Sequence, residues 1–463
     1  MIKKGVNMKY QEFLKQKEVT VIDSGMNVDD KDINNHLFDY QHDIVKWALK
    51  KGKSAVFAGT GLGKTRIQLA WADLINGKVL IFAPLAVASQ TVAEGKEIGI
   101  NVTLCKENAD VKNGINITNY DRMERFDLTQ FTGIVLDESS ILKSQNGKTR
   151  NWLIESCRDI PYKLCCTATP APNDYMELGN HAEFLGVMSE FEMLAMFFIH
   201  DGGDTAKWRL KKHAVKDFWE WVASWAVMMT NPADLGYNGE MFILPKLNIR
   251  QIEVKTEAAT GSLFAVEAKT LQERQQARRD SLKERVAACA ELANKSDEQF
   301  LIWCNLNVES DLIAKSIPDS VEVCGSDTSE HKTESMLGFS NNKIRVLVSK
   351  PSICGFGMNW QQCHNMIFVG LSDSFEQYYQ AVRRCWRFGQ EKEVNVYVIT
   401  ADTEGAVVAN IQRKERDFED MLHGMIAATQ NITAQNIKST GRNQKKYDAK
   451  IKMALPEWLE VGA

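Results

Sequence analysis

The chain has 463 residues, enough for about two to three domains that each bury a core, so a peptide hormone or a small disulfide scaffold is excluded. With 44% hydrophobic and 25% charged residues, the composition is that of an ordinary globular protein and not of a disordered or collagen-like chain. The formal net charge of -4 argues against a protein that coats nucleic acid through bulk positive charge, but a local basic groove stays open.

The cysteines and the apolar runs favour a cytoplasmic protein without a membrane span. Ten cysteines include no Cys-x-x-Cys pair, and Met1–Gly5 lacks the apolar core of a signal peptide, so we expect reduced thiols. The longest apolar stretches, Phe191–Ile199 and Phe218–Met229, each contain a glutamate. Both are shorter than the roughly 20 apolar residues that a membrane span needs.

Short apolar runs alternate with helical or loop segments from Lys53 onward, as in a buried parallel sheet. In the first half, strands are predicted at Ser54–Ala58, Lys78–Ala83, Gly114–Thr118, Gly133–Leu136 and Tyr162–Thr167. A second series at similar spacing is predicted at Gln299–Cys304, Ser320–Cys324, Ile344–Val348, Asn365–Val369 and Val394–Ile399. Two α/β halves are the simplest interpretation.

The segment between the two halves is rich in aromatic residues and methionine, and we predict a helical insertion there. Four of its residues are tryptophans: Trp208, Trp219, Trp221 and Trp225. They either pack inward within a helical subdomain or form a surface for a protein partner. A linking helix is expected from about residue 256 to residue 293, because its apolar positions are three and four apart. A polar, basic tail begins at Thr433.

A glycine-rich turn, Ala58–Thr65, lies between a predicted strand and a predicted helix. With Gly61 and Gly63, such a turn directs successive backbone N–H groups toward one centre, where phosphate oxygens bind at a helix N-terminus. Lys64 would meet the β- and γ-phosphates, and the Thr65 hydroxyl would bind magnesium. Because a structural turn does not need Lys-Thr at this spacing, the turn predicts a nucleotide site.

Two adjacent carboxylates, Asp137 and Glu138, end the apolar strand that begins near Gly133. At the carboxyl end of a parallel strand beside the phosphate loop, Asp137 can hold the magnesium shell while Glu138 polarises the attacking water. A solvated loop or a helix cap could have the same sequence. The phosphate loop upstream favours the catalytic interpretation.

An arginine-rich stretch, Gln380–Gln390, is the third signal. Arg384 and Arg387 are three residues apart, so on a helix two guanidinium groups could reach a single anion, as an arginine finger does. A solvated basic helix face is the alternative.

Taken together, these motifs resemble the superfamily-two helicase-type ATPases, and within them the Swi/Snf-like DNA translocases. The resemblance extends over about residues 37–400. Its most specific string is Arg384–Gln390, close to the Arg-Cys-His-Arg-Ile-Gly-Gln of the family. Two departures are Ser140, where many relatives have histidine or aspartate, and Trp386, where the family has histidine.

This resemblance implies an α/β fold with two tandem RecA-like domains and ATP hydrolysis between them. The implied divisions are an N-terminal extension (1–36), a first RecA-like domain (37–185), a helical insertion (186–255), a second RecA-like domain (256–430) and a basic tail (431–463). Beyond the residues above, it implies that Gln41 and Gly357 contact the nucleotide. Thr167, Thr169 and Gln380 would couple the two halves.

The implied activity is a nucleic-acid-stimulated ATPase that uses ATP and Mg²⁺. Duplex DNA is the expected partner, held largely without sequence specificity through phosphate contacts, for which Thr118 and Ser349 are candidates. An RNA or forked-DNA helicase, and a nucleotide-gated DNA-binding assembly subunit with weak ATPase, stay open as alternatives. The short chain favours the cytoplasm of a bacterial or phage-infected cell.

Overall fold

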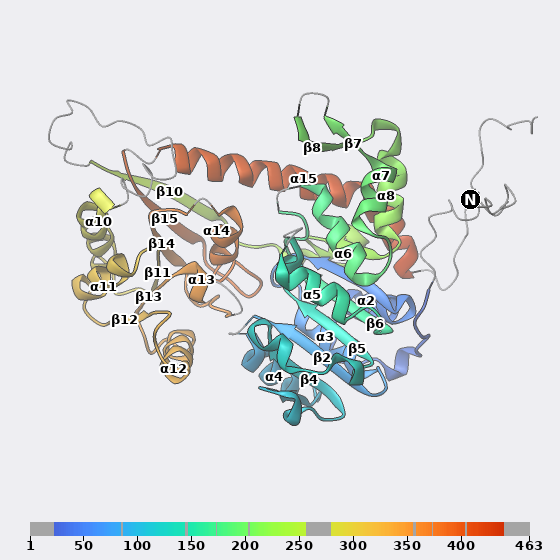
Figure 1. Cartoon of the computed structure of the whole chain (residues 1–463). Helices are drawn as coiled ribbons and strands as arrows, with labels where there is room; N and C mark the ends of the chain where they lie inside the picture. Colours follow the sequence, from blue (N-terminus) through green and yellow to red (C-terminus); the bar gives the residue numbers. More distant parts are fainter. Residues whose placement is uncertain are drawn as a thin grey trace, which may run out of the picture.

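The computed structural model describes residues 23–84, 87–143, 147–172, 174–201, 204–255, 279–354, 358–372, 374–402 and 405–438. The fold is α/β, with two parallel sheets of the kind expected for two RecA-like domains, each forming the centre of one lobe (Figure 1). No helix in these ranges is long and apolar enough to cross a membrane. All ten cysteines are free thiols, and only Cys324 is more than slightly exposed.

The first lobe contains a seven-stranded sheet in the order β3-β4-β2-β5-β6-β1-β9, with every neighbouring pair parallel. Its strands are β1 (Lys53–Ala58), β2 (Lys78–Ala83), β3 (Val102–Leu104), β4 (Gly114–Asn119), β5 (Gly133–Asp137), β6 (Tyr162–Thr167) and β9 (Ala226–Met229). The five strands predicted for this half are all present. Their near-continuous apolar sequences follow from burial on both faces, where separate hydrophobic clusters cover the sheet.

Helices of the first lobe connect these strands and cover the sheet. They are α2 (Asp39–Lys51), α3 (Lys64–Asp73), α4 (Val87–Glu97), α5 (Lys148–Ser156), α6 (Leu178–Leu185), α7 (Glu190–Phe197) and α8 (Val215–Ala223). Since each crossover returns the chain to the same edge, the carboxyl ends of the parallel strands all face one side of the lobe.

The segment predicted as a helical insertion differs from that prediction by containing strands. An antiparallel hairpin, β7 (Phe198–Asp201) and β8 (Asp204–Leu210), follows α7. Strand β9 pairs with β1 and extends the first sheet, whereas β10 (Leu247–Val254) pairs with β15 in the second lobe. A four-residue apolar run such as β9 cannot be told from a buried helical segment by periodicity alone, which explains the difference.

Three of the four tryptophans in this segment lie inside the protein. Trp219, Trp221 and Trp225 are buried, and Trp221 packs edge-on against Trp225 with ring centroids 5.4 Å apart. Trp208 is partly buried and lies against His200 across the hairpin. The inward-packing interpretation therefore describes Trp219, Trp221 and Trp225.

The second lobe contains a six-stranded parallel sheet in the order β10-β15-β14-β11-β13-β12. Its remaining strands are β11 (Phe300–Cys304), β12 (Ser320–Val323), β13 (Val346–Ser349), β14 (Asn365–Val369) and β15 (Val394–Ala401). Its helices are α10 (Leu282–Asn294), α11 (Asn307–Ser316), α12 (Ser329–Ser340), α13 (Pro351–Cys354) and α14 (Phe375–Val382). Most of the predicted linking helix, residues 256–278, lies outside the described residues.

A long helix, α15 (Gly405–Lys438), runs from the second lobe back to the first (Figure 1). Phe418 packs in the second-lobe core, whereas Met425 and Ile426 pack in a core of the first lobe. Asn436 donates a hydrogen bond to the carbonyl of Ala223 at 3.4 Å. The predicted basic tail therefore begins as helix, and residues 439–463 lie outside the described residues.

Candidate active site

The phosphate loop follows β1 and ends where α3 begins at Lys64. Gly61 and Gly63 have φ angles of 89° and 71°, a region that glycine enters without steric cost. A Cβ atom at Gly63 would lie 2.2 Å from the side-chain nitrogen of Gln41, so a larger residue would also collide with its neighbour. The first backbone N–H groups of α3 consequently lie beside the loop, as anion binding requires.

Lys64 is held within this loop. Its ammonium group donates hydrogen bonds to the carbonyls of Ala58, at 2.9 Å, and Gly59, at 3.4 Å. Burial lowers the pKa of Lys64, while the nearby carboxylates of Glu138 and Asp137 counteract that shift. The loop lysine and the two carboxylates thus occupy one poorly solvated site.

Asp137 ends strand β5 beside the phosphate loop. The amide of Gln68, one helical turn beyond Lys64 on α3, donates to its carboxylate at 2.7 Å. Burial raises the pKa of Asp137, while the hydrogen bond from Gln68 and the charge of Lys64 lower it. Sequence reasoning missed Gln68, although its position four residues after Lys64 on a predicted helix places both on one face.

Glu138 has a φ angle of 61°, uncommon for a residue with a side chain and of the kind concentrated at functional sites. Its carboxylate accepts hydrogen bonds from the hydroxyls of Thr167 and, at 3.1 Å, Ser140. Burial raises the pKa of Glu138. Ser140 therefore contacts the carboxylate at the position where many relatives carry histidine or aspartate.

Thr167 ends β6 and also accepts a hydrogen bond from the backbone N–H of Thr169 at 3.0 Å. The Thr169 hydroxyl is buried and makes no hydrogen bond to a described residue. The segment predicted to couple the two halves is thus connected directly to Glu138, through Thr167.

The two arginines predicted as fingers differ in their surroundings. Arg384 is buried and donates to the backbone and side-chain oxygens of Gln380 and to the carbonyl of Met358, at 3.0 to 3.2 Å. Arg387 is half-buried, and its guanidinium donates no hydrogen bond to a described residue. Burial lowers the pKa of Arg384 to about 10 and of Arg387 to about 9, so both keep their charge at neutral pH.

A cleft of about 820 Å³ brings these groups together from the two lobes. Its lining includes the predicted residues Gln41, Gly61, Gly63, Lys64, Thr65, Asp137, Glu138, Gln380, Arg384 and Arg387. The lobes touch at this cleft, because a Cβ atom at Gly61 would lie 2.8 Å from the backbone nitrogen of Phe388. Its volume suits a nucleotide-sized ligand.

Gln41 lines this cleft, with its side chain largely buried. Its amide oxygen accepts from the backbone N–H of Phe38 at 3.1 Å, and its amide nitrogen donates to the carbonyl of Leu62 at 3.2 Å. Gln41 therefore links the start of α2 to the phosphate loop. The neighbouring ring of Phe38 also lines the cleft, beside the predicted base-binding position.

Two predicted residues, Thr118 and Ser349, are absent from the lining of this cleft. Thr118 and Ser349 are buried at the ends of β4 and β13, and the Ser349 hydroxyl donates to the carbonyl of Val323 at 2.8 Å. Both hydroxyls are buried in this arrangement, and their contact with a nucleic-acid strand stays a prediction. Gly357 lies outside the described residues.

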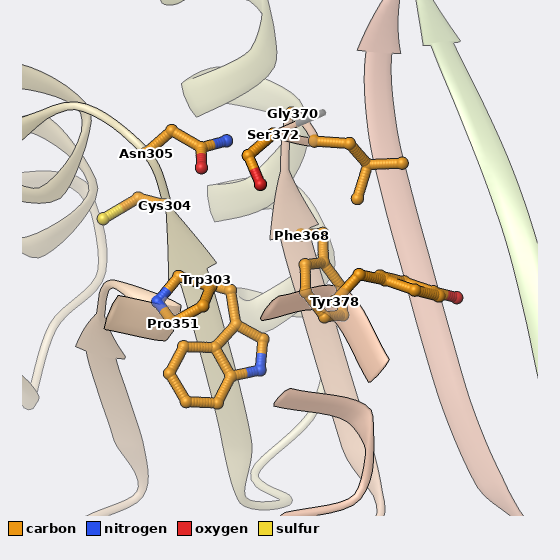
Figure 2. Close-up of a pocket in the computed structure, with 9 residues that line it drawn as sticks. Trp303, Cys304, Asn305, Pro351, Phe368, Gly370, Ser372 and Tyr378 are labelled. Carbon is orange, nitrogen blue, oxygen red and sulfur yellow. The ribbon is translucent and has the colours of Figure 1, made fainter. Parts of the chain in front are cut away.

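A second pocket lies near the carboxyl ends of β11 and β14, between Trp303, Asn305 and Tyr378 (Figure 2). Its volume of about 10 Å³ is enough for roughly one water molecule. It is therefore too small for a nucleotide.

The residues beside the phosphate loop fit a magnesium ion. Mg²⁺ is usually bound through one or two carboxylates together with substrate phosphates and water, not by a cage made only of protein groups. Asp137 and Thr65 supply a carboxylate and a hydroxyl next to the loop. Within the described ranges, no group of three or more histidine, cysteine or acidic residues forms a metal site by itself.

Comparison with known proteins finds similarity to helicases. Residues 283–389 match the helicase conserved C-terminal domain. A protein of Acyrthosiphon pisum secondary endosymbiont phage 1, named only as p41, is 22% identical over 83% of this chain and 97% of its own length.

Two further relatives match over shorter regions. A mimivirus protein described as a candidate ATP-dependent RNA helicase is 30% identical over 20% of the chain, and a TATA-binding protein-associated factor of Schizosaccharomyces pombe is 31% identical over 31%. The chain spans only 18% and 8% of these two proteins. The fold, the matched domain and these relatives together support a superfamily-two helicase-type ATPase.

Proposed function

We propose that this protein is an ATP-dependent translocase that moves on double-stranded DNA and hydrolyses ATP between its two lobes. The observation that carries the proposal is the cleft in which the phosphate loop and both carboxylates of one lobe face Arg384 and Arg387 of the other. Because the catalytic groups come from two lobes, the rate of hydrolysis depends on the relative position of the lobes. A motor requires such a coupling between hydrolysis and lobe movement.

In the proposed reaction, the loop N–H groups and Lys64 hold the β- and γ-phosphates, and Glu138 accepts a proton from the attacking water. Arg387 stabilises the negative charge that develops on the transferred phosphoryl group. Arg384 positions the chain segment that carries Arg387. When bound, Mg²⁺ would neutralise phosphate charge, held by Thr65 and Asp137.

Nucleic acid bound across both lobes would favour the arrangement in which Arg387 reaches the nucleotide, so it should stimulate hydrolysis. If nucleic acid also changes the affinity for ATP, linkage requires ATP to change the affinity for the nucleic acid by that same factor. Duplex DNA is favoured over RNA by the resemblance of Arg384–Gln390 to the Swi/Snf-like string.

An RNA helicase is the second candidate, favoured by the mimivirus relative described as a candidate RNA helicase. A nucleotide-gated assembly subunit with weak ATPase is the third. ATP hydrolysis measured without nucleic acid and with duplex DNA, single-stranded DNA or RNA separates them. Duplex-specific stimulation together with displacement of a third strand from a triplex supports the proposal, whereas stimulation by RNA alone or no stimulation contradicts it.

A further inference from the structure

An ion pair crosses from one lobe to the other beside the active-site cleft. The ammonium group of Lys143 contacts the carboxylate of Glu376, 233 residues later in the chain. The Lys143 side chain is 42% exposed and that of Glu376 only 12%, so the carboxylate is largely shielded from solvent while the lysine is not.

Each partner is rigidly connected to a group of the active site. Lys143 ends the short 3-10 helix Ser139–Lys143, which begins directly after Glu138. Glu376 lies in the first turn of α14, one turn before Gln380, whose oxygens hold Arg384. The pair therefore joins the segment that carries the catalytic glutamate to the helix that leads to the arginines.

The helix α14 is fixed within the second lobe and should move with it. The ring of Phe375 packs against Phe418 of α15, with ring centroids 5.4 Å apart. Arg384 likewise donates all three of its described hydrogen bonds to oxygens of Gln380 and Met358 in its own lobe. The approach of Arg384 and Arg387 to the phosphate loop is thus set by the position of the whole lobe.

We propose that Lys143 and Glu376 are positioning residues that hold the two lobes in the arrangement in which the arginines face the phosphate loop. The contact is an electrostatic latch: it makes and breaks as the lobes close and open, and it acts on the reaction only through Glu138 and the arginines. The inference rests on the proposed ATPase function, since its consequence is a change in turnover.

A charge swap tests the latch. K143E and E376K should each lower kcat for ATP about five- to tenfold, with a smaller change in KM for ATP, because a like-charged pair now opposes closure. The double variant K143E/E376K restores the opposite charges and should return kcat to within about twofold of the native value. The matched control is K315E, which breaks the exposed pair Lys315–Asp311 on α11 and should leave kcat unchanged.

The distance between the lobes provides a readout that does not require turnover. Leu104 and Val308 are exposed on the first and second lobes, respectively. A spin label on a cysteine introduced at each position reports the distance between the lobes. Cys324 is replaced by alanine, because it is a partly exposed free thiol that would also react with the label. With a non-hydrolysable ATP analogue and Mg²⁺, the single variants should show a broader, longer distance distribution, and the double variant the native one.

Single variants with native kcat and native distances, or a double variant as impaired as the sum of both single variants, would overturn the latch. If nucleic acid does not stimulate the ATPase activity of the native protein, the proposed translocase function is contradicted. The distance measurement still tests the latch in that case, because it does not depend on turnover. Thermal unfolding of each variant confirms that the comparison is made on folded protein.

Discussion

Replacing Gln68 by leucine removes a single hydrogen-bond donor from the proposed magnesium ligand. The Gln68 side chain is fully buried, and its amide nitrogen lies 2.7 Å from the carboxylate of Asp137. Leucine has a similar size, so Q68L keeps most of the packing of α3 against the sheet. The substitution removes the hydrogen bond that the buried carboxylate of Asp137 accepts from Gln68.

A hydrogen bond to a charged group contributes about 1.5–3 kcal/mol, so Q68L should weaken binding of the Mg²⁺–nucleotide complex by about ten- to a hundredfold. The pH dependence should shift as well. Burial already raises the pKa of Asp137, and Gln68 opposes that shift, so its removal raises the pKa further. Because the protonated carboxyl cannot bind the ion, the acid limb of the activity profile should move to higher pH.

The same change has a signed effect on stability. A carboxyl whose pKa is higher in the folded than in the unfolded protein does not lower the free energy of unfolding at a pH below both pKa values. As the pH rises through the two pKa values, this carboxyl lowers the free energy of unfolding increasingly. Q68L should therefore lose more stability at neutral pH than near pH 4. Chemical unfolding at the two pH values measures this difference.

Binding of a fluorescent ATP analogue with and without Mg²⁺ is the decisive assay. The loss in Q68L should be confined to the samples with Mg²⁺. The matched control is Q299L, which removes a glutamine that donates to the Phe339 and Ile344 carbonyls in the second lobe, and it should leave the Mg²⁺ dependence unchanged. Equal losses with and without Mg²⁺, or native binding by Q68L, would refute the positioning of Asp137 by this amide.

Three further outcomes are expected. E138Q should bind ATP with native affinity but lower kcat by about 10²- to 10⁴-fold in single-turnover measurements, because it removes the proton acceptor. R387A should lower kcat by about 10³- to 10⁵-fold with an unchanged unfolding midpoint, whereas R384A should also lower the midpoint, because Arg384 supports its own lobe through three hydrogen bonds. Burial lowers the pKa of His181 to about 4, so the native protein should lose about 2–3 kcal/mol of stability between pH 6.5 and pH 4 as the unfolded chain takes up a proton. In H181Q that loss should be smaller by the same amount in acid unfolding titrations.

Local sequence was sufficient for the features that depend on a few consecutive residues. The strands β1, β2, β5 and β6 are apolar on both faces, so their sequences predict buried parallel strands without further context. The glycine-rich turn is equally local, because the positive φ angles at Gly61 and Gly63 are requirements of the turn itself. The backbone geometry of this turn could therefore be predicted from the local sequence alone.

Features that depend on contacts between distant segments came only from the tertiary structure. The short strand β9 is a strand because β1 presents an unpaired edge, and α15 is bound to both lobes through apolar residues at its two ends. The burial of Thr118 and Ser349 likewise depends on the sheets around them.

The sequence by itself determined which chemical groups the protein has: a phosphate-binding turn, two carboxylates and a pair of arginines. Only the tertiary structure decided how they are used, because Gln68 contacts Asp137, Thr167 contacts Glu138 and Lys143 contacts Glu376 across long stretches of chain. The physical reason is that a residue type fixes the charge and hydrogen-bonding capacity of a side chain, whereas its partner, its burial and hence its pKa depend on what the rest of the fold places beside it.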